Sequence, residues 1–226
     1  MNIDYVVDCI DKVNVEFVRG TWNFNHERNF QCLLFGYLRE SDNQSRVETK
    51  EDGEIKTVEL VHAEFNSPST PDTNKYLDIA IMEKKSASSF SEGYDGSPER
   101  ERNRDLSLKA AIEIKFLYGS LKQQKMEEIE NDIEKLKMLL RPRKKLSKRC
   151  YFLLYIDKKI NNKQIVNERI VNVWAKGNWR NIFQAFKKAS KRHKELEVCC
   201  VFGKQNLQCW FSDGKPTWEI VDSSLN

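Results

Sequence analysis

Residues 110–116 read Ala-Ala-Ile-Glu-Ile-Lys-Phe, and this stretch decides the fold and the function that we expect. Side chains of a strand alternate between its two faces. The even-numbered residues, all apolar, then form one face, while Ala111, Glu113 and Lys115 form the other, with the two charges about 7 Å apart. Burying a carboxylate and an ammonium is costly unless they are paired, metal-bound or solvated in a cleft. The stretch therefore predicts a functional site, and the competing interpretation is a strand with an exposed charged face.

A second alternating stretch, residues 76–82, carries a single charged residue, Asp78. If the two strands pair, Asp78 and Glu113 can converge on one hard cation. Mg²⁺ takes oxygen ligands and is often held by one or two carboxylates together with water and phosphate. Lys115 would lie beside such a metal, where it can orient a water or a phosphate oxygen.

Asp78, then Glu113-Ile114-Lys115 on the next strand, followed by a helix and a hydrophobic strand, resembles the PD-(D/E)XK nuclease superfamily. The resemblance covers about residues 25–157. It implies a restriction-endonuclease-like fold, in which helices flank a mixed central β-sheet. Two features depart from the superfamily pattern: Leu77 stands where a proline often precedes the aspartate, and the spacing from Asp78 to Glu113 is long.

The same resemblance implies a phosphodiester hydrolase that depends on Mg²⁺ (or Mn²⁺). Asp78 and Glu113 would bind the metal, with the backbone carbonyl of Ile114 as a further ligand. Lys115 would position the attacking water or help to deprotonate it. The metal would lower the pKa of that water and neutralise charge that grows on the phosphate.

Glu27 begins an expected helix over residues 25–40, for which Asn25 is a suitable N-cap. In the resembling superfamily, a helix with an acidic residue often precedes the catalytic strands. The resemblance therefore implies that Glu27 is a further catalytic and metal-site carboxylate. The alternative is a first-turn glutamate that the helix dipole favours, and the sequence leaves both interpretations open.

The rest of the chain predicts an α/β protein. We expect a first helix over residues 3–18 and strands near 56–65, 76–82, 110–116 and 150–156. The last of these is a nearly continuous apolar run, typical of a central strand covered on both faces. A helix after residue 120 should connect parallel strands, and a small antiparallel element should end the chain, with Asp213-Gly214 as a hairpin signal.

A length of 226 residues and a hydrophobic content of 39% fit a single domain. We divide it into an N-terminal helical region (1–24), the catalytic core (25–157) with a flexible insertion (84–108), and C-terminal helices and hairpin (158–226). No apolar run approaches the 18 or so residues of a membrane span, and no secretory segment is evident. We therefore expect a cytoplasmic protein without membrane partners. Six cysteines without a CxxC pair, and three histidines, make a disulfide framework or a zinc site unexpected.

The net charge of +4 is small, but basic residues gather near residues 141–149 and 187–194. Such clusters attract nucleic-acid backbones. The candidate nucleic-acid-binding residues are Arg143, Lys144, Lys145, Lys148, Lys187 and Lys191. The alternative is a solvated connector and a solvated helix face.

These observations together predict a Mg²⁺-dependent endonuclease of the restriction or defence type. DNA is favoured over RNA as its partner, and a homodimer is compatible with the pattern. Two alternatives stay open, namely a catalytically inactive nucleic-acid-binding module and a protein-interaction subunit.

Overall fold

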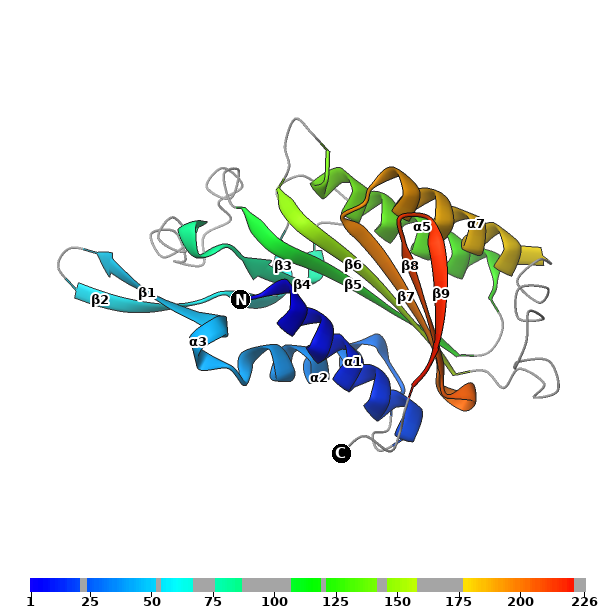
Figure 1. Ribbon diagram of the computed structural model, residues 1–226, viewed down its shortest axis with the longest axis horizontal. Coiled ribbons are helices and arrows are strands. Elements are labelled where there is room, and N and C mark those ends of the chain that lie inside the picture. Colours follow the sequence, from blue (N-terminus) through cyan, green and yellow to red (C-terminus); the bar gives the residue numbers. More distant parts are fainter. Residues whose placement is uncertain are drawn as a thin grey trace.

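The computed structural model describes residues 1–20, 24–51, 54–66, 76–86, 107–118, 121–141, 146–157 and 177–221. Its centre is a mixed sheet in which the described strands follow the chain in the order β3-β4-β5-β6-β7-β8-β9 (Figure 1). Strands β5, β6 and β7 are parallel, and the outer pairs are antiparallel. The bounds are β3 Val61–Asn66, β4 Tyr76–Met82, β5 Leu108–Tyr118, β6 Ser147–Asp157, β7 Leu196–Phe202, β8 Leu207–Ser212 and β9 Lys215–Ile220. The predicted α/β class with a mixed central sheet is confirmed.

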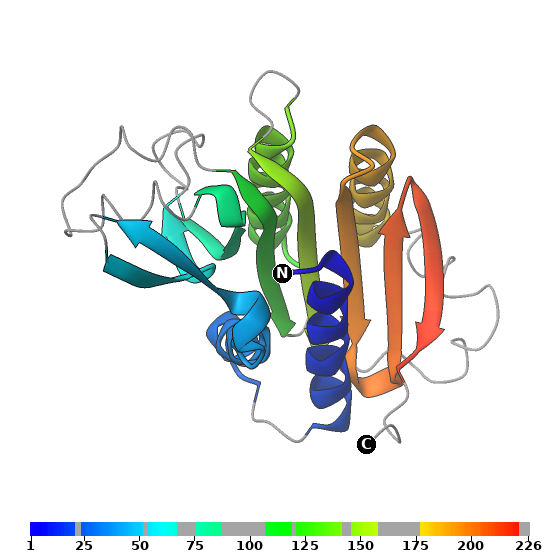
Figure 2. The ribbon, with the colours of Figure 1, turned by 60° about the vertical axis from the view of Figure 1, so that its left-hand side comes forward.

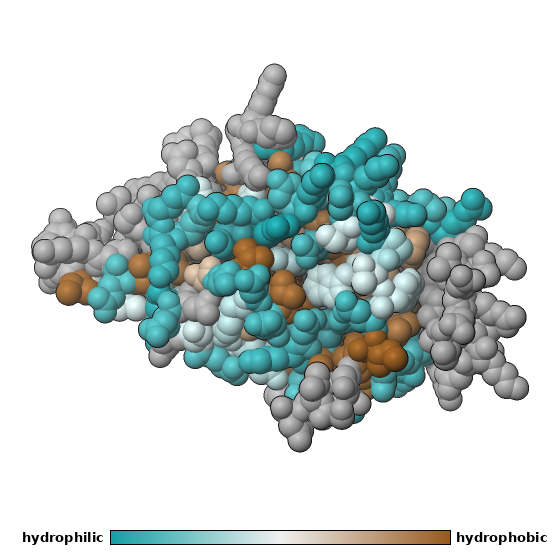
Figure 3. All heavy atoms as spheres, in the orientation of Figure 1, coloured by the Kyte–Doolittle hydropathy of each residue, from teal (hydrophilic) through white to brown (hydrophobic). Residues whose placement is uncertain are grey.

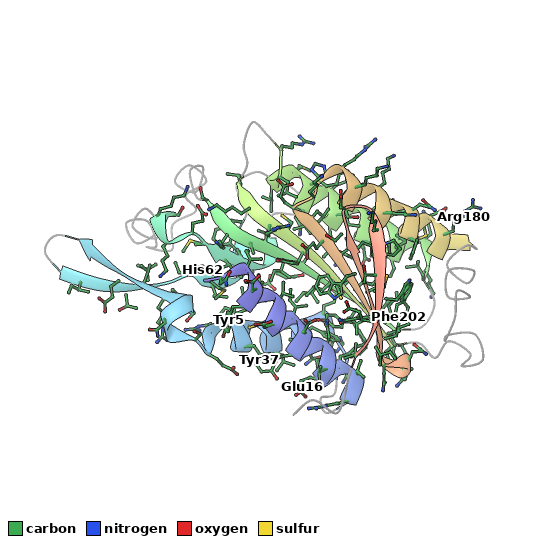
Figure 4. All side chains as sticks on the ribbon, viewed as in Figure 1. Tyr5, Glu16, Tyr37, His62, Arg180 and Phe202 are labelled. Carbon is green, nitrogen blue, oxygen red and sulfur yellow. The ribbon has the colours of Figure 1, made fainter. Side chains whose placement is uncertain are left out.

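Helices cover both faces of this sheet (Figure 2). Helices α5 (Gln123–Leu139) and α7 (Gly177–Arg192) pack on one face, while α1 (Ile3–Arg19) and α2 (Glu27–Arg39) pack on the other. Tyr5 and Tyr37 lie close together on α1 and α2 (Figure 4), and the Tyr5 hydroxyl donates a hydrogen bond of 2.8 Å to the Tyr37 carbonyl. The sheet is therefore the middle of three layers.

Strand β6 is the buried centre of the fold. Residues Cys150 to Ile156 are all 0% exposed, as their nearly continuous apolar run predicts. Both neighbours, β5 and β7, run parallel to it. The predicted parallel connection through a helix is thus confirmed, with α5 between β5 and β6.

The two N-terminal helices end and begin on recognisable local signals. Gly20, at φ 65°, ends α1 in the left-handed conformation that glycine adopts without strain. The N-cap of α2 is His26. The prediction of Asn25 as the cap is wrong by one residue, because the Asn29 side chain accepts the backbone N–H groups of both Asn25 and His26.

A single strand over residues 56–65 is a wrong prediction. The chain instead forms β2 (Glu54–Glu59) and β3, with Leu60 between them. Strand β2 pairs with β1 (Arg46–Glu51), which follows the short helix α3 (Asp42–Ser45), and this ribbon projects from the main sheet (Figure 1). Leu60 makes the change of partner, since its N–H donates to Ser45 and its carbonyl accepts from Met82 on β4.

The predicted antiparallel element at the C-terminus is confirmed, with its hairpin at Asp213-Gly214 between β8 and β9. These strands also extend the main sheet from β7. Two short 3₁₀ turns, η1 (Lys84–Ser86) and η5 (Gly203–Gln205), complete the described elements. Most of the expected insertion over 84–108, and the expected helix before residue 177, lie outside the described residues.

A buried polar network fixes α1 to the sheet. Asn14, which is 0% exposed, donates 2.8 Å to the Gln208 side chain on β8 and accepts 2.9 Å from the Tyr155 hydroxyl on β6. Gln208 in turn donates 3.0 Å to Glu219 on β9. The network satisfies polar groups that burial would otherwise penalise.

No helix in the described part of the chain is long and apolar enough to cross a membrane. The face shown in Figure 3 is largely hydrophilic, and its hydrophobic residues occur in separate small groups.

Candidate active site

The pairing of β4 with β5 brings the two predicted acids together. Ile79 lies opposite Ile112 in an antiparallel ladder, so continuation of the register puts Asp78 opposite Glu113. Directly opposite residues of such a pair point to the same face. That face is the one covered by α5, because Ala80 and Ala111 contribute to the core on the α5 and α7 side of the sheet. The even-numbered residues of 110–116 contribute to the core on the α1 and α2 side.

Asp78 does more than point toward Glu113. Its Oδ2 accepts a hydrogen bond of 2.6 Å from the Ile114 backbone N–H. On the other side, the buried Gln31 of α2 donates 2.7 Å to the Asp78 carbonyl and 3.0 Å to the Glu64 carboxylate. Glu64 has a positive φ of 52°, an uncommon conformation for a residue with a side chain. Both the backbone and the carboxylate of Asp78 are therefore held in one orientation.

Burial changes the proton affinity of both acids. Desolvation raises the pKa of Asp78 from 3.8 to about 6, although the Ile114 N–H partly offsets it. Desolvation also raises the pKa of Glu113 well above its ordinary value, and the negative charge of Asp78 adds to the rise. A buried carboxylate whose ionisation is opposed by a neighbouring carboxylate is a common feature of functional sites.

Glu113 is 2% exposed and faces an ammonium group supplied by α5. Nζ of Lys135 lies 2.7 Å from Oε1 of Glu113. This contact is a close, buried ion pair, so the Lys135 ammonium is the partner of Oε1 of Glu113. Lys135 donates its hydrogen bond to the Tyr76 carbonyl on β4, at 2.8 Å.

Lys115 lies on the same face as Glu113 but contacts different acids. Its Nζ is 3.1 Å from Oδ2 of Asp132 on α5 and 3.5 Å from Oε2 of Glu27. Burial alone would lower the pKa of Lys115, but Asp132 and Glu27 raise it above its ordinary value. The ammonium is therefore strongly held in its charged form.

Glu27 lies at the outer edge of this cluster, in the first turn of α2. Besides its contact with Lys115, it accepts 3.3 Å from the Phe116 backbone N–H on β5. Its side chain is 36% exposed and lines a cavity of about 700 Å³ together with Tyr118, Lys122 and Lys125. Glu27 thus connects α2 to the Lys115 side of the cluster, and the cavity gives that side contact with solvent.

Sequence reasoning missed Asp132 and Lys135. Both are buried on α5, and Asp132 bridges the two lysines, with Oδ1 at 3.5 Å from Lys135 and Oδ2 at 3.1 Å from Lys115. The helical spacing predicts the burial of Asp132, because it lies three residues after Ile129 and four before Leu136, on the apolar stripe of the helix. Charged residues inside a buried stripe are the signal that could have revealed them.

The predicted basic residues lie apart from this cluster. Lys148 is the second residue of β6, four residues and about 13 Å before the level of Glu113. It pairs with Glu83. Lys187 and Lys191 are exposed on α7. Arg180, labelled in Figure 4, is exposed in the first turn of the same helix. Arg143, Lys144 and Lys145 lie outside the described residues.

The sequence and the structure were compared with protein-family models, curated proteins and solved structures. None of the three comparisons found a match. The chemistry of the cluster is therefore the feature that points to a function.

The donor set can be tested against a divalent cation. No group of three or more His, Cys, Asp or Glu residues in the described ranges is arranged to hold a metal ion. Asp78 and Glu113 still provide two carboxylates, and the Lys135 ammonium occupies the position of a cation beside Oε1 of Glu113. Mg²⁺ is often bound by one or two carboxylates plus water and phosphate oxygens. A Mg²⁺ or Mn²⁺ ion bound by these two carboxylates would need water and substrate oxygens to complete its coordination.

Proposed function

We propose that this protein is a metal-dependent nuclease with a restriction-endonuclease-like fold, which hydrolyses phosphodiester bonds, with DNA as the favoured substrate. One observation carries the proposal. Asp78, Glu113 and Lys115 share one face of two adjacent strands in the buried centre of an α/β sheet. Charged groups are expensive to keep there unless they have a chemical task or complete pairing.

Asp78 and Glu113 would hold Mg²⁺ or Mn²⁺, and the Ile114 carbonyl, between Glu113 and Lys115 in the chain, is the further ligand that the superfamily resemblance suggests. When bound, the ion would acidify a water and neutralise charge on the phosphate. The hydrogen bond from Ile114 N–H fixes one Asp78 oxygen, which leaves the other oxygen for the cation. Gln31 restrains the strand at the same residue.

Lys115 would act as a permanent positive charge. Because Asp132 and Glu27 raise its pKa above the ordinary value, it is poorly suited to accept a proton from water. It can instead hold a water or a phosphate oxygen by a charge-assisted hydrogen bond. Glu27 would contribute by orienting Lys115 from the cavity side, at 3.5 Å. This role for Glu27 is closer to positioning than to direct metal binding.

The test is cleavage of radiolabelled or fluorescent DNA and RNA, single- and double-stranded, with Mg²⁺, with Mn²⁺ and with EDTA. Asp78→Ala, Glu113→Gln and Lys115→Ala should each reduce cleavage at least about 100-fold, because each removes a group that acts on the reacting phosphate. Glu130→Gln, at an exposed position of α5, is the matched control and should cleave like the wild type. Wild-type cleavage by all three site variants would refute the proposal.

A second function is favoured by one specific contact. The ammonium of Lys135, 2.7 Å from Glu113, already supplies a positive charge where a metal would be expected. A chain in which this arrangement is permanent would be a nucleic-acid-binding module without catalysis. Salt-dependent nucleic-acid binding that is indifferent to EDTA, without cleavage under any condition, would support this module. Absence of any nucleic-acid binding would instead favour a protein-interaction subunit.

A further inference from the structure

Lys135 is the most enclosed charged side chain of the cluster that the catalytic proposal leaves without a task. Its side chain is 6% exposed. Its Nζ is surrounded by three oxygens from three elements, Glu113 Oε1 on β5 at 2.7 Å, the Tyr76 carbonyl on β4 at 2.8 Å and Asp132 Oδ1 on α5 at 3.5 Å. An ammonium group that binds oxygens of both site strands resembles a bound cation in its surroundings.

The electrostatics explain why an ammonium lies there. Asp78, Glu113 and Asp132 are three acids in a poorly solvated region, and carboxylates of this kind need nearby positive charge. Lys115 serves Asp132 and Glu27, so Lys135 is the described cation in contact with Glu113. A metal that binds Glu113 would bring a second positive charge within a few ångströms of this ammonium, and the two would repel each other.

We propose that Lys135 is an internal cation that competes with the metal for Glu113 and thereby sets the affinity of the site. This inference rests on the proposed metal-dependent function. When a divalent ion is absent, the ammonium neutralises Glu113. When one binds, the ammonium moves to Asp132, which lies one helical turn away on the same helix and already contacts it. Lys135 is thus a positioning residue, not a catalytic one.

Asp132 is suited to receive the displaced ammonium. Its two oxygens face different lysines, Oδ1 toward Lys135 and Oδ2 toward Lys115. Oδ1 lies 3.5 Å from the Lys135 ammonium, longer than a close ion pair, so this oxygen can take a nearer contact while Oδ2 stays with Lys115. A pair at i and i+3 on a helix can tighten through side-chain rotation alone.

The experiment measures metal affinity directly, by calorimetric titration of the full chain with MnCl₂ at pH 7.5. Lys135→Met keeps the length and apolar stem of the side chain and removes its charge. We expect Lys135→Met to bind Mn²⁺ at least about tenfold more tightly than the wild type, because a close like charge is gone. Binding of Mn²⁺ to folded Lys135→Met with unchanged or weaker affinity would overturn the inference.

Two matched variants separate direct competition from general charge effects. Lys115→Met removes the same charge from the same cluster but from a side chain that contacts Asp132 and Glu27, so its gain in affinity should be clearly smaller. Lys137→Met, on the same helix, loses a pair with Glu134 and should bind like the wild type. Equal gains for Lys135→Met and Lys115→Met would overturn the inference.

A further variant keeps the inference testable if Lys135→Met does not fold without metal. Asp132→Asn retains Lys135 but removes the alternative partner of its ammonium, so Mn²⁺ should bind more weakly. Unchanged or tighter binding by Asp132→Asn would contradict the inference. The outcomes also separate it from the nuclease proposal. Tighter Mn²⁺ binding by Lys135→Met in a chain that never cleaves nucleic acid would support the internal cation and exclude the nuclease. Cleavage by the wild type, with equal Mn²⁺ affinities for the wild type and Lys135→Met, would support the nuclease and exclude the internal cation.

Discussion

At the scale of single residues, Asp78 links the site to stability. Its folded-state pKa of about 6 exceeds the ordinary value of 3.8, so the folded chain binds this proton more tightly than the unfolded chain. Stability from Asp78 is then fully present below about pH 4 and is lost as the pH rises through about 6. The difference corresponds to at most about 3 kcal/mol.

We therefore expect the melting temperature of the metal-free wild type to fall between pH 4.5 and pH 7 more steeply than that of Asp78→Asn. Asparagine can still accept the Ile114 N–H but does not ionise. Circular dichroism melts in EDTA would measure both slopes, with exposed Glu130→Gln as the control. Glu113, whose pKa is also raised, contributes in the same direction in both proteins. Identical slopes for the wild type and Asp78→Asn would exclude a raised pKa at Asp78.

The same scale shows where sequence reasoning reached its limit. The positions of Asp78, Glu113 and Lys115 on one face followed from alternation, because a strand has a fixed period of two. The partners of these charges did not follow. Lys115 pairs with Asp132, and Glu113 pairs with Lys135. Both partners lie on α5, the helix that connects β5 to β6, and no local sequence pattern specifies which strand residue each of them contacts. The charged residues Glu113 and Lys115, two positions apart in an apolar strand, indicated a site. Only the fold shows which oppositely charged side chains lie beside them.

At the scale of elements, the buried amide of Asn14 hydrogen-bonds α1 to the sheet. Asn14→Ala would remove the acceptor of the Tyr155 hydroxyl and the Asn14 donor to the Gln208 side-chain oxygen. Unsatisfied buried groups of this kind cost about 1–3 kcal/mol, so the free energy of unfolding should fall by about that amount. Urea denaturation would measure it. Asp8→Ala, at an exposed position of the same helix, should change the value by less than about 0.5 kcal/mol, and equal effects of the two changes would contradict the role of the network.

Helices and strands with a regular spacing of apolar residues were predicted well. Strands whose limits depend on a change of hydrogen-bonding partner were not. The apolar run of β6 and the stripes of α1 and α5 depend only on local burial. The division of residues 54–66 into β2 and β3 depends on Leu60, whose backbone bonds Ser45 on one side and Met82 on the other. The pattern of side chains passes through that residue without interruption, so the sequence alone favours one long strand.

At the scale of the whole molecule, the charge of α7 lies on the same side of the sheet as Asp78 and Glu113. If DNA extends from the site across this side, Lys187→Ala combined with Lys191→Ala should weaken DNA binding. The slope of log K against log salt concentration should become shallower by about two. Fluorescence anisotropy in the Glu113→Gln background would measure it without cleavage.

Lys12→Ala is the control for this prediction, because Lys12 is exposed on α1, on the other side of the sheet. It should leave the slope unchanged. An unchanged slope for the double variant would exclude α7 as a DNA contact and would direct attention to the cavity beside Glu27, where Lys122 and Lys125 lie.

The order of the strands has a consequence for how the protein is made. Each strand of the main sheet pairs with the one before it in the chain, so a nascent polypeptide can add strands in the sequence in which the ribosome releases them. A product that stopped after Asp157 would contain every residue of the acid and lysine cluster, yet β6 would have lost β7 and would present a long apolar edge to other chains. Premature termination there should therefore yield an aggregating fragment, because the strand that covers this apolar edge lies in the last third of the chain.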